Sequence, residues 1–221
     1  MDTKTLLQLV ATGKSDERTL ALSALTVDNN HYSALLQSLT EVEDTSLNFW
    51  ALDLLIKHFP HFLQRDSSRT IPLVIACLTR NSGPVCDRAI WALNIIGLPA
   101  LEALVAATHD APDTLASAYY MGAIKENANV YLLANQIINL LDKQLDSSNE
   151  YVRYWALVVL TDISPLRPWF DTRMSVKLFE PLYSKLLSVA QQLIANKHEE
   201  MAAQYERLLI QHLTPNGLYR P

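Results

Sequence analysis

Two tryptophans of this 221-residue chain are each followed, one helical turn later, by a polar side chain that could hold a ligand. Trp50 precedes Asp53, and Trp91 precedes Asn94. An exposed aromatic ring beside a carboxylate or an amide could anchor the side chain of a partner, as the hot spots of protein interfaces do. The same rings could instead fill the wedge between neighbouring helices, because large aromatic residues often pack at the edge of a core.

Other spacings that could support chemistry are incomplete. His58 and His61 suit a metal pair only if one helix continues through Pro60, and an interior proline disrupts a helix, so we interpret them as two solvated histidines at a hinge. The segment 198–202 lacks the second histidine of the zinc-protease pattern. The sequence contains no phosphate loop, nucleophile elbow or dinucleotide fingerprint. We therefore expect no catalytic residues, no metal and no cofactor.

Composition and charge narrow the class of protein. A hydrophobic content of 49% is ample for a core, and only five glycines together with the absence of alternating β-branched runs favour an all-α fold. The net charge is −5 and the basic residues are scattered, which disfavours nucleic acid as a partner. No apolar run is long enough to cross a bilayer, and the first residues predict a helix rather than a signal peptide. Cys77 and Cys86 are interpreted as buried apolar residues in a reducing cytoplasm, which is the compartment we expect.

The tripeptide Trp-Ala-Leu occurs three times, at 50–52, 91–93 and 155–157, each time after a bulky residue. Apolar residues recur around it at steps of three and four, which predicts amphipathic helices joined in hairpins. The expected helices cover residues 3–11, 15–25, 31–39, 44–59, 70–79, 84–96, 99–108, 112–126, 130–145, 149–163, 176 or 181 to 196, and 198–213. We expect residues 59–68 to be mostly irregular and the proline-rich segment 164–172 to interrupt the helices.

The helices around Val85–Ile96 and Tyr151–Leu160 resemble the second helices of HEAT repeats, whose loose signature begins with an aliphatic residue and Arg and has a small residue in its middle. Arg153 and Arg18 match that Arg, whereas Asn48 and Cys86 replace it in the other two helices. The resemblance covers nearly the whole chain. It implies a fold of stacked helical hairpins whose second helices form a concave surface.

Two alignments of the repeats disagree about one tryptophan. Aligning the Trp-Ala-Leu copies and aligning the HEAT-like alanines give the same register for Trp50 and Trp155, but registers that differ by three residues for Trp91. The sequence does not choose between them. All three rings should lie at the margin of the apolar stripe, and Trp91 is the one expected to be presented differently.

Together these features predict an all-α protein, a right-handed α-α superhelix of about six HEAT-like hairpins, with one domain over residues 1–214 and a loose C-terminal tail at 215–221. We expect a non-catalytic scaffold that binds a protein or peptide on its concave face. The residues expected to bind the partner are Trp50, Asp53, Trp91, Asn94, Tyr119, Tyr120, Arg153 and Trp155.

The resemblance also implies two alternative functions. HEAT-like DNA glycosylases act on alkylated bases, and in such an enzyme Trp50 with Asp53, or Trp91 with Asn94, would hold the damaged nucleotide. HEAT-like lyases attach bilins to antenna proteins. The resemblance to these glycosylases implies a basic groove. The net negative charge of the chain therefore argues against a glycosylase function.

Overall fold

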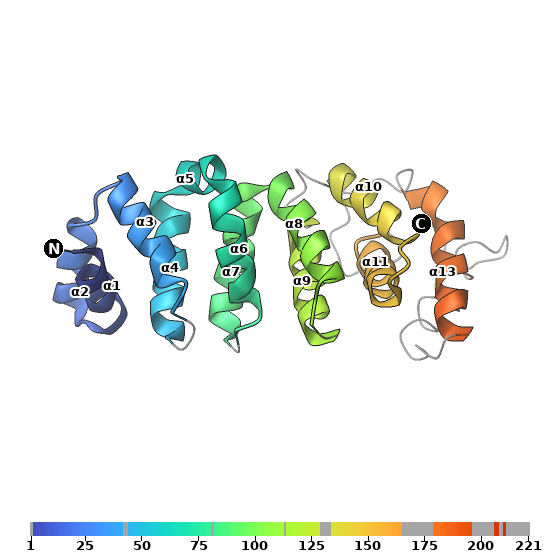
Figure 1. Ribbon diagram of the computed structural model, residues 1–221, viewed down its shortest axis with the longest axis horizontal. Coiled ribbons are helices and arrows are strands. Elements are labelled where there is room, and N and C mark those ends of the chain that lie inside the picture. Colours follow the sequence, from blue (N-terminus) through green and yellow to red (C-terminus); the bar gives the residue numbers. More distant parts are fainter. Residues whose placement is uncertain are drawn as a thin grey trace, which may run out of the picture. The chain divides into compact units, whose positions relative to one another are not determined.

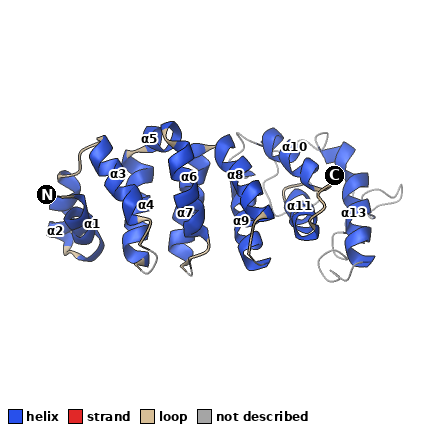
Figure 2. Ribbon diagram, in the orientation of Figure 1, coloured by secondary structure: helices blue, strands red, loops and turns tan. Residues whose placement is uncertain are grey.

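The computed structural model describes residues 2–41, 44–80, 82–112, 114–128, 134–164, 179–195, 206, 207 and 210. Every regular element in these residues is a helix, as Figure 2 shows. The chain forms two compact units, Met1–Ala103 and Leu104–Pro221, which are described separately below. The single domain expected over residues 1–214 stays a prediction, and the expected tail 215–221 lies outside the described residues.

Unit 1 is a succession of helical hairpins (Figure 1). Helix α1 packs against α2, α3 and α4, helix α3 against α4, and helix α7 against α4, α5 and α6. Each hairpin thus covers the apolar face of the next, which is how an α-solenoid builds a continuous core. The elements are α1 (Thr3–Thr12), α2 (Ser15–Ser23), α3 (Asn29–Ser38), α4 (Thr45–His58), α5 (Pro60–Arg65), α6 (Ser67–Leu78) and α7 (Gly83–Ile96), followed by α8 (Leu98–His109), within which the unit boundary falls.

Unit 2 continues the same pattern of paired helices. Helix α11 is its centre, because it packs against α9, α10 and α13. The described elements are α9 (Thr114–Ala128), α10 (Ala134–Gln144), α11 (Glu150–Asp162), a 3₁₀ turn η1 (Glu180–Leu182) and α13 (Tyr183–Ala195). The proline-rich segment expected to break the helices and most of the last predicted helix lie outside the described residues.

The prediction that residues 59–68 are irregular is wrong. Helix α5 occupies Pro60–Arg65, and α6 already begins at Ser67. Pro60 is the first residue of α5, where its missing N–H costs no hydrogen bond, and Leu63 is buried. Proline therefore ends α4 and starts another helix instead of opening a loop, and His58 and His61 lie exposed on either side of that break.

The ends of α7 are as the sequence predicts. Pro84 stands in its first turn, and Gly97 follows its last residue with φ 82°, a conformation that side chains with a Cβ rarely adopt. Helix α8 can therefore start immediately afterwards at Leu98.

A fully buried alanine marks the same position in four of the second helices. It is the seventh residue of α2, α4, α7 and α11, and in each case its exposure is 0%: Ala21, Ala51, Ala89 and Ala156. A methyl group at that position lets neighbouring helices approach closely, so these alanines define a common structural frame.

In that frame the fourth residue of a second helix reaches back to a carbonyl just before the helix. The Arg18 Nε donates to Val10 O at 2.9 Å, Asn48 Nδ2 to Glu41 O at 2.9 Å, and Arg153 Nη1 to Ser147 O at 2.6 Å. The Val10 carbonyl lies in the last turn of α1, and the carbonyls of Glu41 and Ser147 lie in the connections that follow α3 and α10, so each bond ties a second helix to the chain before it. The Arg of the HEAT-like signature thus has a structural role here, and Asn48 performs it where the signature is lost.

The frame also resolves the register of Trp91. Trp50 and Trp155 are the sixth residues of α4 and α11, whereas the sixth residue of α7 is Arg88 and Trp91 is its ninth. Both Trp50 and Trp155 are half-buried, but Trp91 is 57% exposed. The expectation that Trp91 is presented differently is therefore confirmed.

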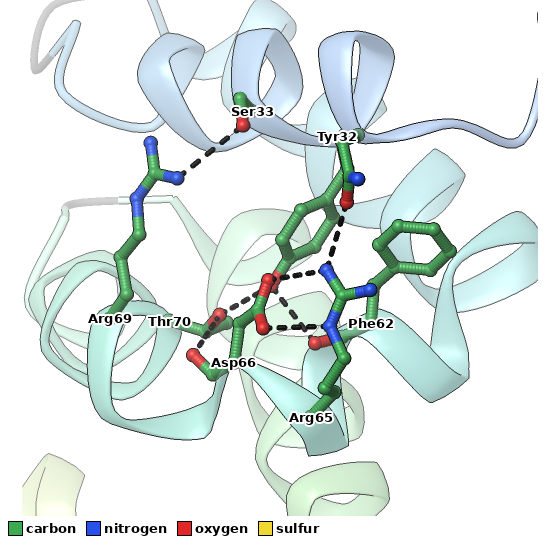
Figure 3. Close-up of polar contacts among 8 residues, drawn as sticks. Tyr32, Ser33, Phe62, Arg65, Asp66, Arg69 and Thr70 are labelled. Carbon is green, nitrogen blue, oxygen red and sulfur yellow. Dashed lines mark hydrogen bonds and ion pairs between the residues drawn. The ribbon is translucent and has the colours of Figure 1, made fainter.

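A buried polar cluster joins α3 to the turn between α5 and α6 (Figure 3). The Tyr32 hydroxyl lies 2.6 Å from Thr70 Oγ1 and also donates to Phe62 O at 3.2 Å, and Thr70 Oγ1 donates to Asp66 O at 3.0 Å. Arg65 holds both oxygens of the Asp66 carboxylate at 2.8 Å. Burial raises the pKa of Tyr32. The cluster fixes the short helix α5 that the sequence did not predict.

We expect Tyr32→Phe to lower the free energy of unfolding by about 1 kcal/mol, because the buried hydroxyl loses its hydrogen bonds while the ring still packs. Urea denaturation measures the change. Tyr119→Phe is the matched control and should change stability by less than about 0.5 kcal/mol, since Tyr119 is exposed. Equal losses in the two variants would show that the cluster does not stabilise the fold.

Candidate partner-binding surface

The second helices of unit 1 carry a connected row of aromatic and charged side chains, which we call the ridge. It consists of Arg18 on α2, Phe49, Trp50, Asp53 and Lys57 on α4, and Arg88 and Trp91 on α7. Each of these side chains contacts at least one other member of the ridge. The sequence predicted Trp50, Asp53 and Trp91 as binding residues, and the structure places all three in this row.

Asp53 is the charged centre of the ridge. Its side chain is only 4% exposed, yet two cations reach it. Lys57 Nζ donates to Oδ2 at 2.7 Å, and Arg88 Nε forms an ion pair with Oδ1 at 3.0 Å without the alignment of a hydrogen bond. Burying a carboxylate is costly unless it is paired. Asp53 therefore holds Arg88 of the neighbouring helix in place instead of being presented to a ligand.

The Arg88 guanidinium in turn stacks on two rings. Its central carbon lies 5.2 Å from the ring centroid of Phe49 and 5.2 Å from that of Trp91, within the range of cation–π contacts. Trp91 is thereby restrained while more than half of its surface remains open to solvent. A large ring that is both exposed and held in place loses little entropy when a partner packs on it.

Trp50 is enclosed more fully than Trp91. The Arg18 guanidinium lies 5.1 Å from the centroid of the indole, and the Phe49 ring meets it edge to face with centroids 5.3 Å apart and an interplanar angle of 83°. Trp50 is half-buried as a result. It therefore packs against side chains of α2 and α4 while part of its surface remains exposed.

The remaining predicted residues are more dispersed. Asn94 is half-buried on α7. In unit 2, Tyr119 is 37% exposed and Tyr120 is half-buried on α9. On α11, Trp155 packs edge to face with Tyr154, and Arg153 is committed to the carbonyls of Ser147 and Ser148.

The sequence prediction missed Arg88, Phe49, Lys57 and Arg18. Two signals could have found some of them. Lys57 follows Asp53 by four residues, which is the spacing of an ion pair on a helix. Arg88 is the sixth residue of α7, the position that Trp50 holds in α4 when the buried alanines are aligned. The contact between Arg88 and Asp53 crosses two helices, so no local spacing reveals it.

The described residues offer little else that could bind a small ligand or a metal. Within them no group of three His, Cys, Asp or Glu side chains could hold a metal ion. A hollow of about 380 Å³ lies between α1 and the start of α4, lined by Thr5, Gln8, Leu9, Ala11, Thr12, Asp44, Ser46 and Leu47. Its one carboxylate, on Asp44, accepts the Leu47 N–H and so caps α4.

The two cysteines are free thiols. Cys77 is buried, and desolvation raises its pKa to about 11, so it is protonated at neutral pH. Cys86 is half-buried and its pKa is also raised by burial. Among the described helices, none has the length and apolar character needed to span a membrane.

Comparison with known proteins gives limited information. No protein-family model matches the chain, and no curated protein matches it significantly. Among solved structures, it is similar to the designed armadillo repeat protein YIII(Dq.V1)4CPAF in complex with peptide (KR)4, with 16% identity over 97% of this chain and 100% of that one and a TM-score of 0.43. A second designed armadillo repeat protein, YIII(Dq)4CqI, has 16% identity over 96% of this chain and 100% of its own length, with a TM-score of 0.41. Because both TM-scores are below 0.5, we base no conclusion about binding on them.

We expect Asp53→Asn to lower the free energy of unfolding by about 2 kcal/mol, because it removes the charge that compensates Arg88 between two helices. Lys57→Gln should cost less than about 0.5 kcal/mol, since the Lys57 side chain is 60% exposed and its ion pair is largely solvated. Urea denaturation of both variants tests the difference. If Lys57→Gln were the more damaging change, Arg88 would not be the principal partner of Asp53.

Proposed function

We propose that this protein is a scaffold of helical repeats that binds a protein or peptide along the exposed faces of its second helices. The observation that supports this most directly is Trp91, a large aromatic side chain that is 57% exposed and restrained by Arg88. Exposed, ordered aromatic side chains bordered by arginine are typical of the centres of protein interfaces.

The chemistry of the ridge supports binding rather than a reaction. Its one carboxylate, on Asp53, is buried and engaged by Lys57 and Arg88. In the glycosylase resemblance this carboxylate would face a damaged nucleotide, but here both of its oxygens face side chains of the protein. No specific observation favours the glycosylase or the bilin lyase over a binding scaffold.

The predicted residues take different parts in this proposal. Trp91 and the exposed part of Trp50 would contact the partner, and Asp53 would act through Arg88 by fixing its position. Asn94 lies one turn beyond Trp91 on α7 and would border the same contact. In unit 2, Tyr119, Tyr120, Arg153 and Trp155 belong to the corresponding helices α9 and α11.

Selection from a phage-displayed peptide library on the full chain tests the proposal, followed by calorimetric measurement of Kd for the selected peptides. We expect Trp91→Ala to weaken binding by about 30-fold, the effect of removing a hot-spot side chain worth about 2 kcal/mol. Val27→Ala is the matched control, because Val27 is equally exposed in the same unit but lies outside the ridge. It should leave Kd unchanged.

The proposal fails if the library yields no binding peptide, or if Trp91→Ala and Val27→Ala bind the selected peptides equally well. Circular dichroism of each variant establishes that the helices are intact. Because Trp91 is largely exposed, its truncation should leave the fold undisturbed.

A further inference from the structure

Helix α7 presents an acid and an indole on its outer face. Asp87 and Trp91 are its fifth and ninth residues, so they lie one helical turn apart on the same face. Both side chains are exposed. The helical period places them opposite the buried side of α7, which is formed by Val85, Ala89, Ala92, Leu93 and Ile96.

Asp87 is an acid without a counter-ion in the part of the chain that the structure describes. None of the ion pairs or hydrogen bonds among these residues involves its carboxylate. The other charged residue of α7, Arg88, is paired with Asp53 at 3.0 Å, and Asp53 also accepts a hydrogen bond from Lys57. The uncompensated charge of α7 is therefore negative.

The Trp91 ring lies beside this acid and is available to a second cation. The Arg88 guanidinium lies over one face of the indole, 5.2 Å from its centroid, yet 57% of Trp91 is exposed, so ring surface stays accessible on the side away from Arg88. Both faces of an aromatic ring attract cations. Because Asp53 compensates the charge of Arg88, repulsion between Arg88 and a second cation is reduced.

The charge of the surroundings also favours a cationic group over an anionic one. Residues 1–103, which make up unit 1, contain eleven Asp and Glu but eight Lys and Arg. The helices that carry the ridge have the same sign of imbalance. Within α2, α4 and α7 the acids are Asp16, Glu17, Asp53 and Asp87, and the bases are Arg18, Lys57 and Arg88. This excess of negative charge attracts a positively charged group to the surface.

We propose that Asp87 and Trp91 bind an arginine side chain of the partner, with the guanidinium stacked on the accessible side of the indole and paired with the Asp87 carboxylate. Side chains four residues apart on a helix have Cβ atoms about 6 Å apart, so one guanidinium can contact both. Arginine suits the site better than lysine, because its planar fork stacks on aromatic rings and pairs with a carboxylate through two N–H groups. This inference rests on the proposed scaffold function and names the partner group bound at α7.

The test uses the ¹⁵N-labelled full chain and a probe with a single guanidinium, N-acetyl-arginine amide. The indole N–H resonance of Trp91, identified by its loss in Trp91→Leu, is followed by NMR during the titration. N-acetyl-citrulline amide has nearly the same shape without the charge and is the control probe. We expect the arginine derivative to shift the Trp91 resonance in a saturable way and the citrulline derivative to bind about tenfold more weakly.

Asp87→Asn should weaken binding of the arginine derivative about fivefold, because one exposed ion pair is lost. It should leave binding of the citrulline derivative unchanged, since citrulline has no charge to pair. Asp16→Asn is the matched control, because it removes the same charge from an exposed position of unit 1 away from Trp91, and it should leave both Kd values unchanged. Urea denaturation of both variants should give the wild-type midpoint, since both side chains are exposed.

The assignment is overturned if the arginine derivative does not shift the Trp91 resonance, or if the two derivatives bind equally well. It is also overturned if Asp87→Asn binds the arginine derivative as wild type does, or if Asp16→Asn weakens binding as much, which would indicate attraction by net charge alone. Failure of the proposed function is a different result. A library peptide that depends on Trp91, while the arginine derivative does not bind, would refute only the recognition of arginine at α7.

Discussion

The complete burial of an alanine at one place in four of the second helices is the constraint on which the rest of the structure depends. Ala21, Ala51, Ala89 and Ala156 stand at the same place in their helices, and none has any exposed surface. A larger side chain at that position would push the helices apart, since protein interiors have no spare volume. With that position fixed, the sixth residue of each of these helices, one position before the alanine, remains at least partly exposed.

The ridge follows from this geometry. Because α4 and α7 lie close together, Arg88 reaches both the buried carboxylate of Asp53 and the ring of Phe49, and it restrains Trp91 as well. The ion pair between Asp53 and Arg88 therefore positions exposed side chains more than it stabilises the core. A buried pair contributes little net stability, because its attraction mainly compensates the cost of desolvating the two charges. Asp53 itself is hidden from any partner, but the exposed ring depends on it through Arg88.

The same geometry gives different surfaces where the sequence changes. In α4 the sixth and ninth residues are the half-buried Trp50 and the buried Asp53, whereas in α7 they are the half-buried Arg88 and the exposed Trp91. Arg88 of α7 pairs with Asp53 of α4, so the charges of neighbouring helices compensate each other while the Trp91 ring stays exposed to solvent. A repeat fold can therefore present distinct binding chemistries on successive helices while keeping one pattern of burial.

The sequence by itself predicted most of the described helices and the pairing of α1 with α2, α3 with α4, α6 with α7 and α10 with α11, because a 3.6-residue apolar period and glycine and proline at the ends of helices are local features. It also singled out Trp91 as the tryptophan whose register was ambiguous, and the structure resolved that register. The tertiary structure decided that residues 60–65 form a helix, since the Tyr32 and Thr70 contacts that hold it come from other helices. It also decided that Asp53 is buried against Arg88, because a contact between residues on two helices depends on how closely those helices pack, which no spacing along the chain records.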